Sequence, residues 1–140
     1  MRDINRIVVH CSATPVGMDI GVAEITDWHK KRGFTTIGYH FVIRRDGTVE
    51  TGRPVATPGA HALGANSDSI GICLVGGVDA NDKMKADANF TLNQYGALVA
   101  LLSNLCKDYG IDKKDIIGHR DVLGAAKACP CFDVQALLED

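Results

Sequence analysis

The dipeptide Asp46-Gly47, placed between two short runs rich in β-branched and aromatic residues, constrains the fold of this chain more than any other local feature. Asp-Gly is favoured in two-residue hairpin turns, because the central residues of such turns adopt positive φ angles that these residue types tolerate. Residues 38–44 and 48–51 are therefore expected to be neighbouring antiparallel strands. The sheet of this protein must contain at least that one antiparallel pair.

Two longer apolar runs, residues 6–11 and 69–75, are typical of buried strands, because both are rich in Ile and Val and both are followed by loop-forming residues. Residues 115–118 are expected to form another short strand. Residues 53–69 contain many Gly, Ala and Pro residues and are expected to form a long irregular loop.

Helical spacing of apolar residues predicts a first helix over residues 20–32 and a closing helix over 133–138. Between them, Thr91 and Gln94 have the form of a capping box, which predicts a long helix that starts at Leu92. Apolar residues at steps of three and four predict its buried face, namely Leu92, Tyr95, Val99, Leu102, Cys106 and Tyr109.

Strands that alternate with helices, together with the hairpin, predict an α/β fold: a single domain over residues 1–140 with a central mixed β-sheet flanked by helices. A chain of 140 residues is long enough to bury a core without disulfides. Its content of 46% hydrophobic and 23% charged residues is that of an ordinary globular protein.

Charge and hydropathy exclude several classes of function. The formal net charge of -2 argues against a nucleic-acid partner. The apolar runs are too short to span a bilayer, and the N-terminal residues lack the apolar core of a secretory signal, so we expect no membrane insertion and no export signal. We therefore expect a protein made in the cytoplasm of the producing cell, and we also expect it to be a monomer.

The five cysteines are an odd number spread over distant segments, which does not indicate a disulfide scaffold. Cys73 and Cys106 lie in apolar runs and are expected to be buried small hydrophobic residues. Cys129 and Cys131 flank Pro130, and residues two apart are poorly placed for a disulfide, so Cys131 is expected to be a free thiol.

His10, His119 and Cys129 are candidate ligands of one catalytic zinc ion, which characteristically uses three protein ligands and keeps a fourth position for water. His10 and His119 both fall at predicted strand ends, where α/β proteins bind ligands. Their spacing alone does not distinguish a zinc site from two alternatives. His10 could be a core histidine, and Cys129 or Cys11 could be a nucleophile activated by a histidine.

Five ordered segments resemble a known family: residues 10–14, 28–34, 38–53, 59–77 and 118–133, which contain HCSAT, WHKKRGF, GYHFVIRRDGTVETGR, GAHALGANSDSIGICLVGG and GHRD with KACPCFD. They are similar to the zinc-dependent N-acetylmuramoyl-L-alanine amidases of the type-2 amidase and peptidoglycan-recognition-protein superfamily, and to the small phage lysozyme-type amidases within it. The resemblance implies hydrolysis of the amide bond between N-acetylmuramic acid and L-alanine in peptidoglycan, by a phage or prophage endolysin.

The resemblance also implies roles for individual residues. It places His10, His119 and Cys129 on one zinc ion and makes Tyr39 and Lys127 catalytic. A lysine ammonium and a tyrosine hydroxyl are suited to stabilise the oxyanion of amide hydrolysis and to move its proton.

His61 falls in the loop that lines the groove of this family, and it is expected to contact substrate or the zinc-bound water. His40 follows Tyr39 on a predicted strand, so it is expected to point to the opposite face and to have a structural role.

Two alternatives remain at this point. One is a peptidoglycan-binding module without catalytic activity, against which the presence of Cys129 argues. The other is an amidase that also binds and regulates a phage RNA polymerase, although few residues precede the first predicted strand.

Overall fold

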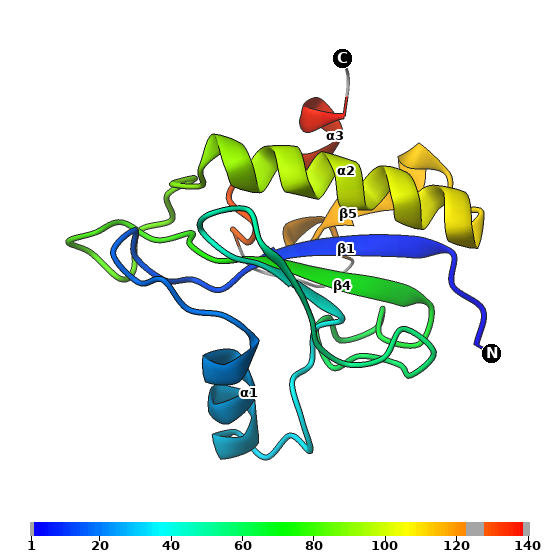
Figure 1. Ribbon diagram of the computed structural model, residues 1–140, viewed down its shortest axis with the longest axis horizontal. Helices are drawn as coiled ribbons and strands as arrows, with labels where there is room; N and C mark the ends of the chain where they lie inside the picture. The colour runs from blue at the N-terminus through cyan, green and yellow to red at the C-terminus, as the bar shows by residue number, and fades with distance from the viewer. Residues whose placement is uncertain (1, 123–127, 139–140) are drawn as a thin grey trace.

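The computed structural model describes residues 2–122 and 128–138, and within these residues one five-stranded sheet has the strand order β3-β2-β4-β1-β5 (Figure 1). The strands are β1 (Arg6–Cys11), β2 (Phe41–Ile43), β3 (Val49–Thr51), β4 (Ser69–Leu74) and β5 (Ile116–Gly118). Only β2 and β3 pair antiparallel; the pairs β1–β4, β1–β5 and β2–β4 are parallel. The predicted mixed sheet and its hairpin are confirmed.

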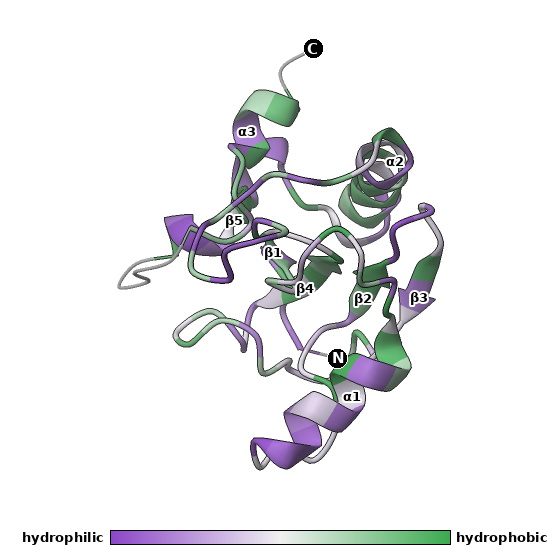
Figure 2. Ribbon diagram, turned by 90° about the vertical axis from the view of Figure 1, so that its left-hand side faces the viewer, coloured by the Kyte–Doolittle hydropathy of each residue, from purple (hydrophilic) through white to green (hydrophobic). Residues whose placement is uncertain are grey.

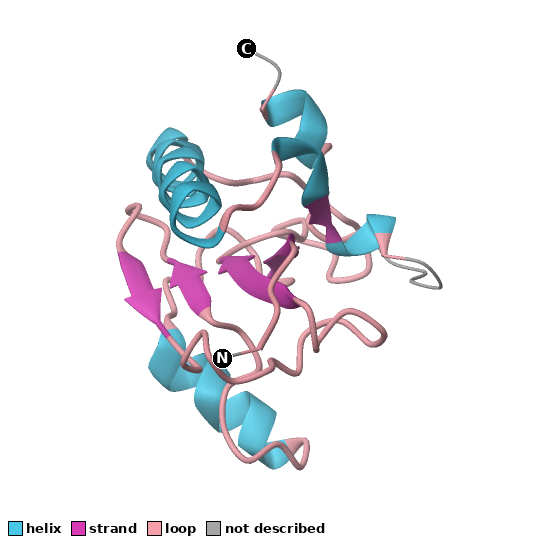
Figure 3. Cartoon of the chain, turned by 90° about the vertical axis from the view of Figure 1, so that its right-hand side faces the viewer, coloured by secondary structure: helices cyan, strands magenta, loops and turns pink. Residues whose placement is uncertain are grey.

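Helices cover both faces of this sheet (Figure 3). The long helix α2 (Leu92–Tyr109) crosses one face, and α1 (Val22–Lys31) lies on the other. The short helix α3 (Val134–Leu137) packs beside β5, which is flanked by the 3-10 turns Lys113–Asp115 and His119–Asp121. None of the helices in the described residues combines the length and the apolar character needed to cross a bilayer.

Side chains of the central strands alternate between two environments. Ile7, Val9, Ile70 and Ile72 belong to the apolar core that includes α2. Because successive residues of a strand point to opposite faces, the residues between them face the other way. The strands themselves are largely apolar, as their colours show in Figure 2. The α2 face therefore holds the larger core, and the opposite face is free to carry polar groups, His10 among them.

The start and end of α2 agree with the sequence, but its buried face does not. The Thr91 hydroxyl accepts from the Gln94 N–H, the Gln94 side chain accepts from the Thr91 N–H, and Gly110 ends the helix in the left-handed conformation. The buried residues are Gln94, Leu98, Leu102 and Leu105.

The expectation that Leu92 and Val99 are buried was wrong, because these side chains are 88% and 43% exposed. The buried Gln94 amide explains the difference. It donates to the carbonyl oxygens of Ile43 and Val75, and so it turns its own side of the helix toward the sheet.

Replacing Leu98 by Ala should lower the free energy of unfolding by about 2–5 kcal/mol, because a completely buried side chain is removed and a cavity remains. The matched change Leu92→Ala should alter stability by about 0.5 kcal/mol or less, because Leu92 is on the surface. Urea unfolding of the two variants measures both values. Equal losses would contradict the observed orientation of α2.

Candidate metal centre and active site

His10 and His119 meet because their strands are paired in parallel. β1 and β5 are aligned so that Val9 lies opposite Gly118; His10 follows Val9 within β1, and His119 is the first residue after β5. Their ring centroids are 4.5 Å apart. Residues separated by more than a hundred positions are thus brought together by strand register alone, at the carboxyl ends of the strands, as the sequence predicted.

Cys129 reaches the same place from the segment that follows β5. Its carbonyl oxygen accepts from the Arg120 N–H at 2.8 Å, and its Sγ accepts from the Cys11 N–H at 3.0 Å. The next residue, Pro130, follows a cis peptide bond and packs over Gly118, where a Cβ atom would lie 2.7 Å from the proline ring. Backbone contacts on both sides therefore place this thiol beside the end of β1.

The three side chains form a donor set that fits a zinc ion. One ligand atom each from His10, His119 and Cys129 lie within 4.8 Å of one another. Imidazole nitrogen and thiolate sulfur are the ligands that zinc prefers. The hydrogen bond from the Cys11 N–H helps to hold the sulfur of Cys129 in place.

Tyr39 lies beside this donor set. It precedes β2, and its ring centroid lies 5.1 Å from that of His10 and 5.3 Å from that of His29 in α1. Removal from water raises the pKa of the Tyr39 phenol well above its usual value, and nearby thiols, Cys73 first among them, add to the effect. The phenol therefore keeps its proton at neutral pH and can donate a hydrogen bond.

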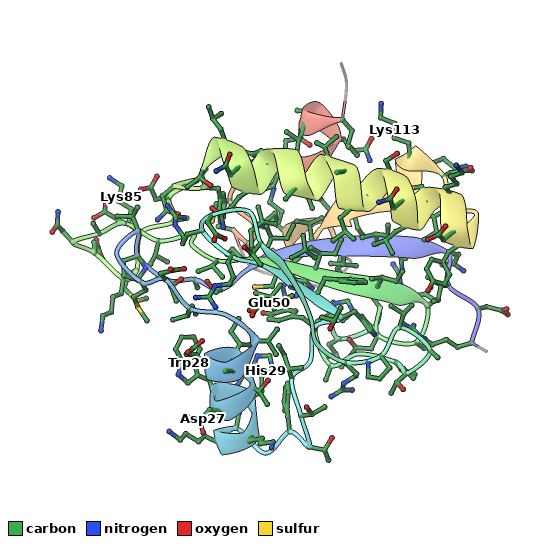
Figure 4. The ribbon with its side chains drawn as sticks, viewed as in Figure 1. Asp27, Trp28, His29, Glu50, Lys85 and Lys113 are labelled. Atoms are coloured by element: carbon green, nitrogen blue, oxygen red, sulfur yellow. The ribbon has the colours of Figure 1, made fainter. Side chains whose placement is uncertain are left out.

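His29 supports the backbone that carries Tyr39. Figure 4 shows Trp28 and His29 on different sides of α1, and the Nδ1 atom of His29 accepts from the Gly38 N–H at 2.9 Å. This contact makes His29 a structural support for the segment that precedes β2.

His40 has two backbone partners and lies beside the side chain of Arg2, whose Nη2 is 3.3 Å from the His40 Nε2. Its Nδ1 accepts from the Gly71 N–H at 3.0 Å, and its Nε2 lies 2.8 Å from the Thr57 carbonyl oxygen. A structural role was expected. The expected place on a strand was not found, because Tyr39 and His40 both precede β2. The His40 ring lies 5.8 Å from that of His61.

A pocket of about 250 Å³ contains the donor set. Its lining residues are His10, Cys11, Ser12, Ala13, Arg32, Phe34, Tyr39, Ala60, His61, His119 and Cys129. A larger groove of about 670 Å³ lies under α2 and α3, but its lining is mostly apolar and lacks histidine, so we place the chemistry in the smaller pocket. Arg32 and Phe34 are lining residues that the sequence did not single out.

Comparison with known proteins identifies the family. Residues 1–132 match the family described as N-acetylmuramoyl-L-alanine amidase. The chain belongs to this family. This amidase is 51% identical over 134 residues to the endolysin of Enterobacteria phage K11, an alignment that covers 96% of this chain and 85% of the relative.

Solved structures agree with the family assignment. The N-acetylmuramoyl-L-alanine amidase LysC from Clostridium intestinale has a TM-score of 0.79 and 32% identity, over 98% of this chain and 86% of that one. Drosophila PGRP-LB has a TM-score of 0.77 and 26% identity, over 97% and 79% of the two chains. The predicted fold and the predicted amidase activity on peptidoglycan are confirmed, and the module without catalytic activity is set aside.

The structure brings together five of the six site residues that the sequence singled out, namely His10, His119, Cys129, Tyr39 and His61, in one pocket. Lys127 lies outside the described residues. All five cysteines are free, as expected, although Cys106 is only partly buried. The Cys131 thiol donates to the Gly77 carbonyl oxygen at 3.2 Å. The roles of these residues in metal binding and catalysis stay predictions.

The buried His40 should make the protein less stable in mild acid. Burial lowers the pKa of His40, and repulsion by Arg2 and Arg53 adds to this effect, although the bond to Thr57 opposes it. An unfolded histidine titrates near 6.5, so below that pH the unfolded chain binds more protons than the folded one. The free energy of unfolding should therefore fall as the pH drops from about 7.5 to 5.5.

Urea unfolding at several pH values in this range measures how steeply the free energy of unfolding depends on pH. A chelator is present to remove the effects of bound metal. His40→Asn keeps an acceptor for the Gly71 N–H but cannot titrate. Its slope should be shallower by at most about 1.4 kcal/mol per pH unit, the limit for one proton. Identical slopes for the variant and the wild type would rule out His40 as a source of the acid sensitivity.

Proposed function

We propose that this amidase is a zinc-dependent phage or prophage endolysin that acts as a monomer on the bacterial cell wall, with His10, His119 and Cys129 as the ligands of one zinc ion. The observation that carries the proposal is the convergence of these three donors within 4.8 Å of one another in a pocket that also holds Tyr39. The endolysin role is supported by two relatives that are named endolysins and are 51% and 50% identical to this chain.

A bound zinc ion supplies a Lewis acid that activates water and polarises the carbonyl of the bond to be cut. The residues of the chain supply the remaining requirements. The amide carbonyl gains negative charge on its oxygen when it is attacked, and a hydrogen-bond donor placed at that oxygen lowers the barrier. The protonated phenol of Tyr39, whose ring lies 5.1 Å from that of His10, is suited to be that donor.

Lys127 is proposed as a second stabilising group. The family resemblance assigns it this role, and its position two residues before Cys129 in the sequence supports the assignment. Its ammonium would favour the negatively charged oxygen, and either Lys127 or Tyr39 could hand the proton to the leaving amine of L-alanine.

Cys129→Ala should lose zinc and amidase activity while it keeps its fold, because one of three proposed ligands is removed and the side chain is only partly buried. Metal analysis and digestion of purified cell wall test this. The wild type should release new α-amino groups of L-alanine without new reducing sugar ends, and a chelator should stop the release. New reducing ends would contradict the bond assignment.

Cys131→Ser is the matched control, because Cys131 is a neighbouring thiol that bonds to a backbone carbonyl and is outside the donor set. This variant should retain one zinc ion per chain and most of the activity. Retention of zinc by Cys129→Ala, or its loss from Cys131→Ser, would mean that the wrong cysteine has been assigned.

Tyr39→Phe should reduce kcat by about 10²–10³-fold, the usual cost of removing one donor from an oxyanion site. Its zinc content and its unfolding midpoint should stay near the wild-type values, since the ring and its packing are kept. Steady-state hydrolysis of a soluble muropeptide measures kcat and KM separately. A change in KM alone would show that the hydroxyl binds substrate rather than stabilises the transition state.

A further inference from the structure

Both ring nitrogens of His61 are engaged inside the protein. Nδ1 lies 2.7 Å from the Nε2 of His10, and Nε2 lies 3.2 Å from the Oγ of Ser69. Ser69 is completely buried in β4, and its Oγ lies 2.5 Å from the carbonyl oxygen of Ala65. Four groups thus form one continuous row of hydrogen bonds that ends on the candidate ligand His10.

The carbonyl at the far end fixes the direction of every bond in this row. A carbonyl oxygen can only accept, so the Ser69 hydroxyl must give its single proton to Ala65. Ser69 must then accept from His61, whose Nε2 therefore carries a proton. In a neutral imidazole the other nitrogen is an acceptor, so the Nδ1 of His61 accepts from the Nε2–H of His10.

His61 is held in the neutral form that this direction requires. The ring lies beside the rings of His10 and His40, with centroids 4.9 and 5.8 Å away, and none of the described residues that line the pocket is a carboxylate that would favour a charged imidazole. A charged His61 would carry protons on both nitrogens and could not accept from His10.

The backbone around His61 is shaped to hold the ring. A Cβ atom on Gly71 of β4 would lie 2.6 Å from the His61 ring, and one on Gly59 would lie 2.5 Å from it. The ring therefore fills space that only glycine leaves free. The Oδ1 atom of Asn66 accepts from the N–H groups of His61 and Ala62, at 2.8 and 2.9 Å, and closes the loop that carries the ring.

We propose that His61, directed by Ser69 and Ala65, is a positioning residue that holds His10 in its Nε2–H tautomer and thereby leaves Nδ1 as the metal-binding atom. This inference rests on the proposed zinc site. Ligand histidines commonly donate their second N–H to an acceptor, and loss of that acceptor typically weakens metal binding by about 10–100-fold. Since both nitrogens of His61 are used in this way, its ring nitrogens are not free to bind substrate, which narrows the role that the sequence predicted for it.

An imidazole acceptor differs from a carboxylate in its charge. A carboxylate in this position would place a second negative charge beside the Cys129 thiolate and would reduce the positive charge that a bound ion presents to substrate. Neutral His61 fixes the orientation of His10 and adds no charge.

The first test uses the wild-type protein without metal, and it needs no variant. Nitrogen NMR of the imidazole groups, with the chain uniformly labelled, should show the proton of His10 on Nε2 and that of His61 also on Nε2. A proton on the Nδ1 of His10 would overturn the proposal. Because no metal is present, this result is independent of whether the zinc site is correct.

The second test measures zinc affinity by competition with a chromophoric chelator. His61→Leu should bind zinc about 10–100-fold more weakly than the wild type. His61→Asn, which offers an acceptor oxygen near the place of Nδ1, should recover most of the loss. Ser69→Ala, which removes the group that directs His61 and changes the fold least, should show a smaller loss of several-fold and a mixture of His10 tautomers.

Unfolding in the presence of chelator shows whether each variant is folded before its affinity is interpreted. A zinc Kd of folded His61→Leu within about twofold of the wild type would overturn the inference. Failure of the wild type to bind zinc at all would instead refute the proposed function and leave the tautomer result standing.

Discussion

The parallel pairing of β1 with β5 is the interaction on which the rest of the site depends. It sets Val9 opposite Gly118, and this register makes His10 and His119 neighbours although the chain between them contains most of the domain. The pairing of β1 with β4 on the other side brings Ser69 and Gly71 to the same region of the sheet. A change of register by one residue would send His10 to the opposite face of the sheet and separate the donors. The apolar core under α2 stabilises this register, because Ile7 and Val9 can be buried there in only one alignment.

The two faces of the sheet have different roles: one holds the apolar core, and the other carries the polar groups of the candidate site. The face under α2 is packed with aliphatic side chains, whereas the other face buries the polar groups His10, His40 and Ser69. Burial of polar groups without partners is costly. Here none of the buried side-chain nitrogen and oxygen atoms in the described residues lacks a hydrogen bond. The glycines at positions 59 and 71 make this possible, because they let imidazole rings approach the backbone closely enough to bond. The cost of a polar interior is thus offset by hydrogen bonds that also orient the site.

The sequence could predict those structural features that depend on residues close together in the chain. The Asp46-Gly47 hairpin and the capping box of Thr91 and Gln94 are local signals, and both are confirmed. The buried side of α2 was misjudged, because Gln94 is polar and its buried position depends on carbonyl groups in distant strands. The contact of His61 with His10 and that of Cys129 with Cys11 are likewise made across the fold, and no spacing in the sequence signals them. The family resemblance, rather than periodicity, selected the three ligands together.

The charges of the pocket connect this arrangement to amide hydrolysis. None of its described lining residues is an Asp or a Glu. Tyr39 stays protonated, and His61 stays neutral. Cys129 would then be the anionic ligand of the proposed site, and its Sγ accepts a hydrogen bond from the Cys11 N–H. A divalent ion held by one thiolate and two neutral imidazoles would keep a net positive charge. That charge is what a neutral amide needs in order to be attacked, since negative charge develops on its oxygen in the transition state. In the proposed site, an acceptor without charge behind His10 would therefore meet two requirements: it would fix the orientation of the ligand, and it would leave a bound metal ion electrophilic.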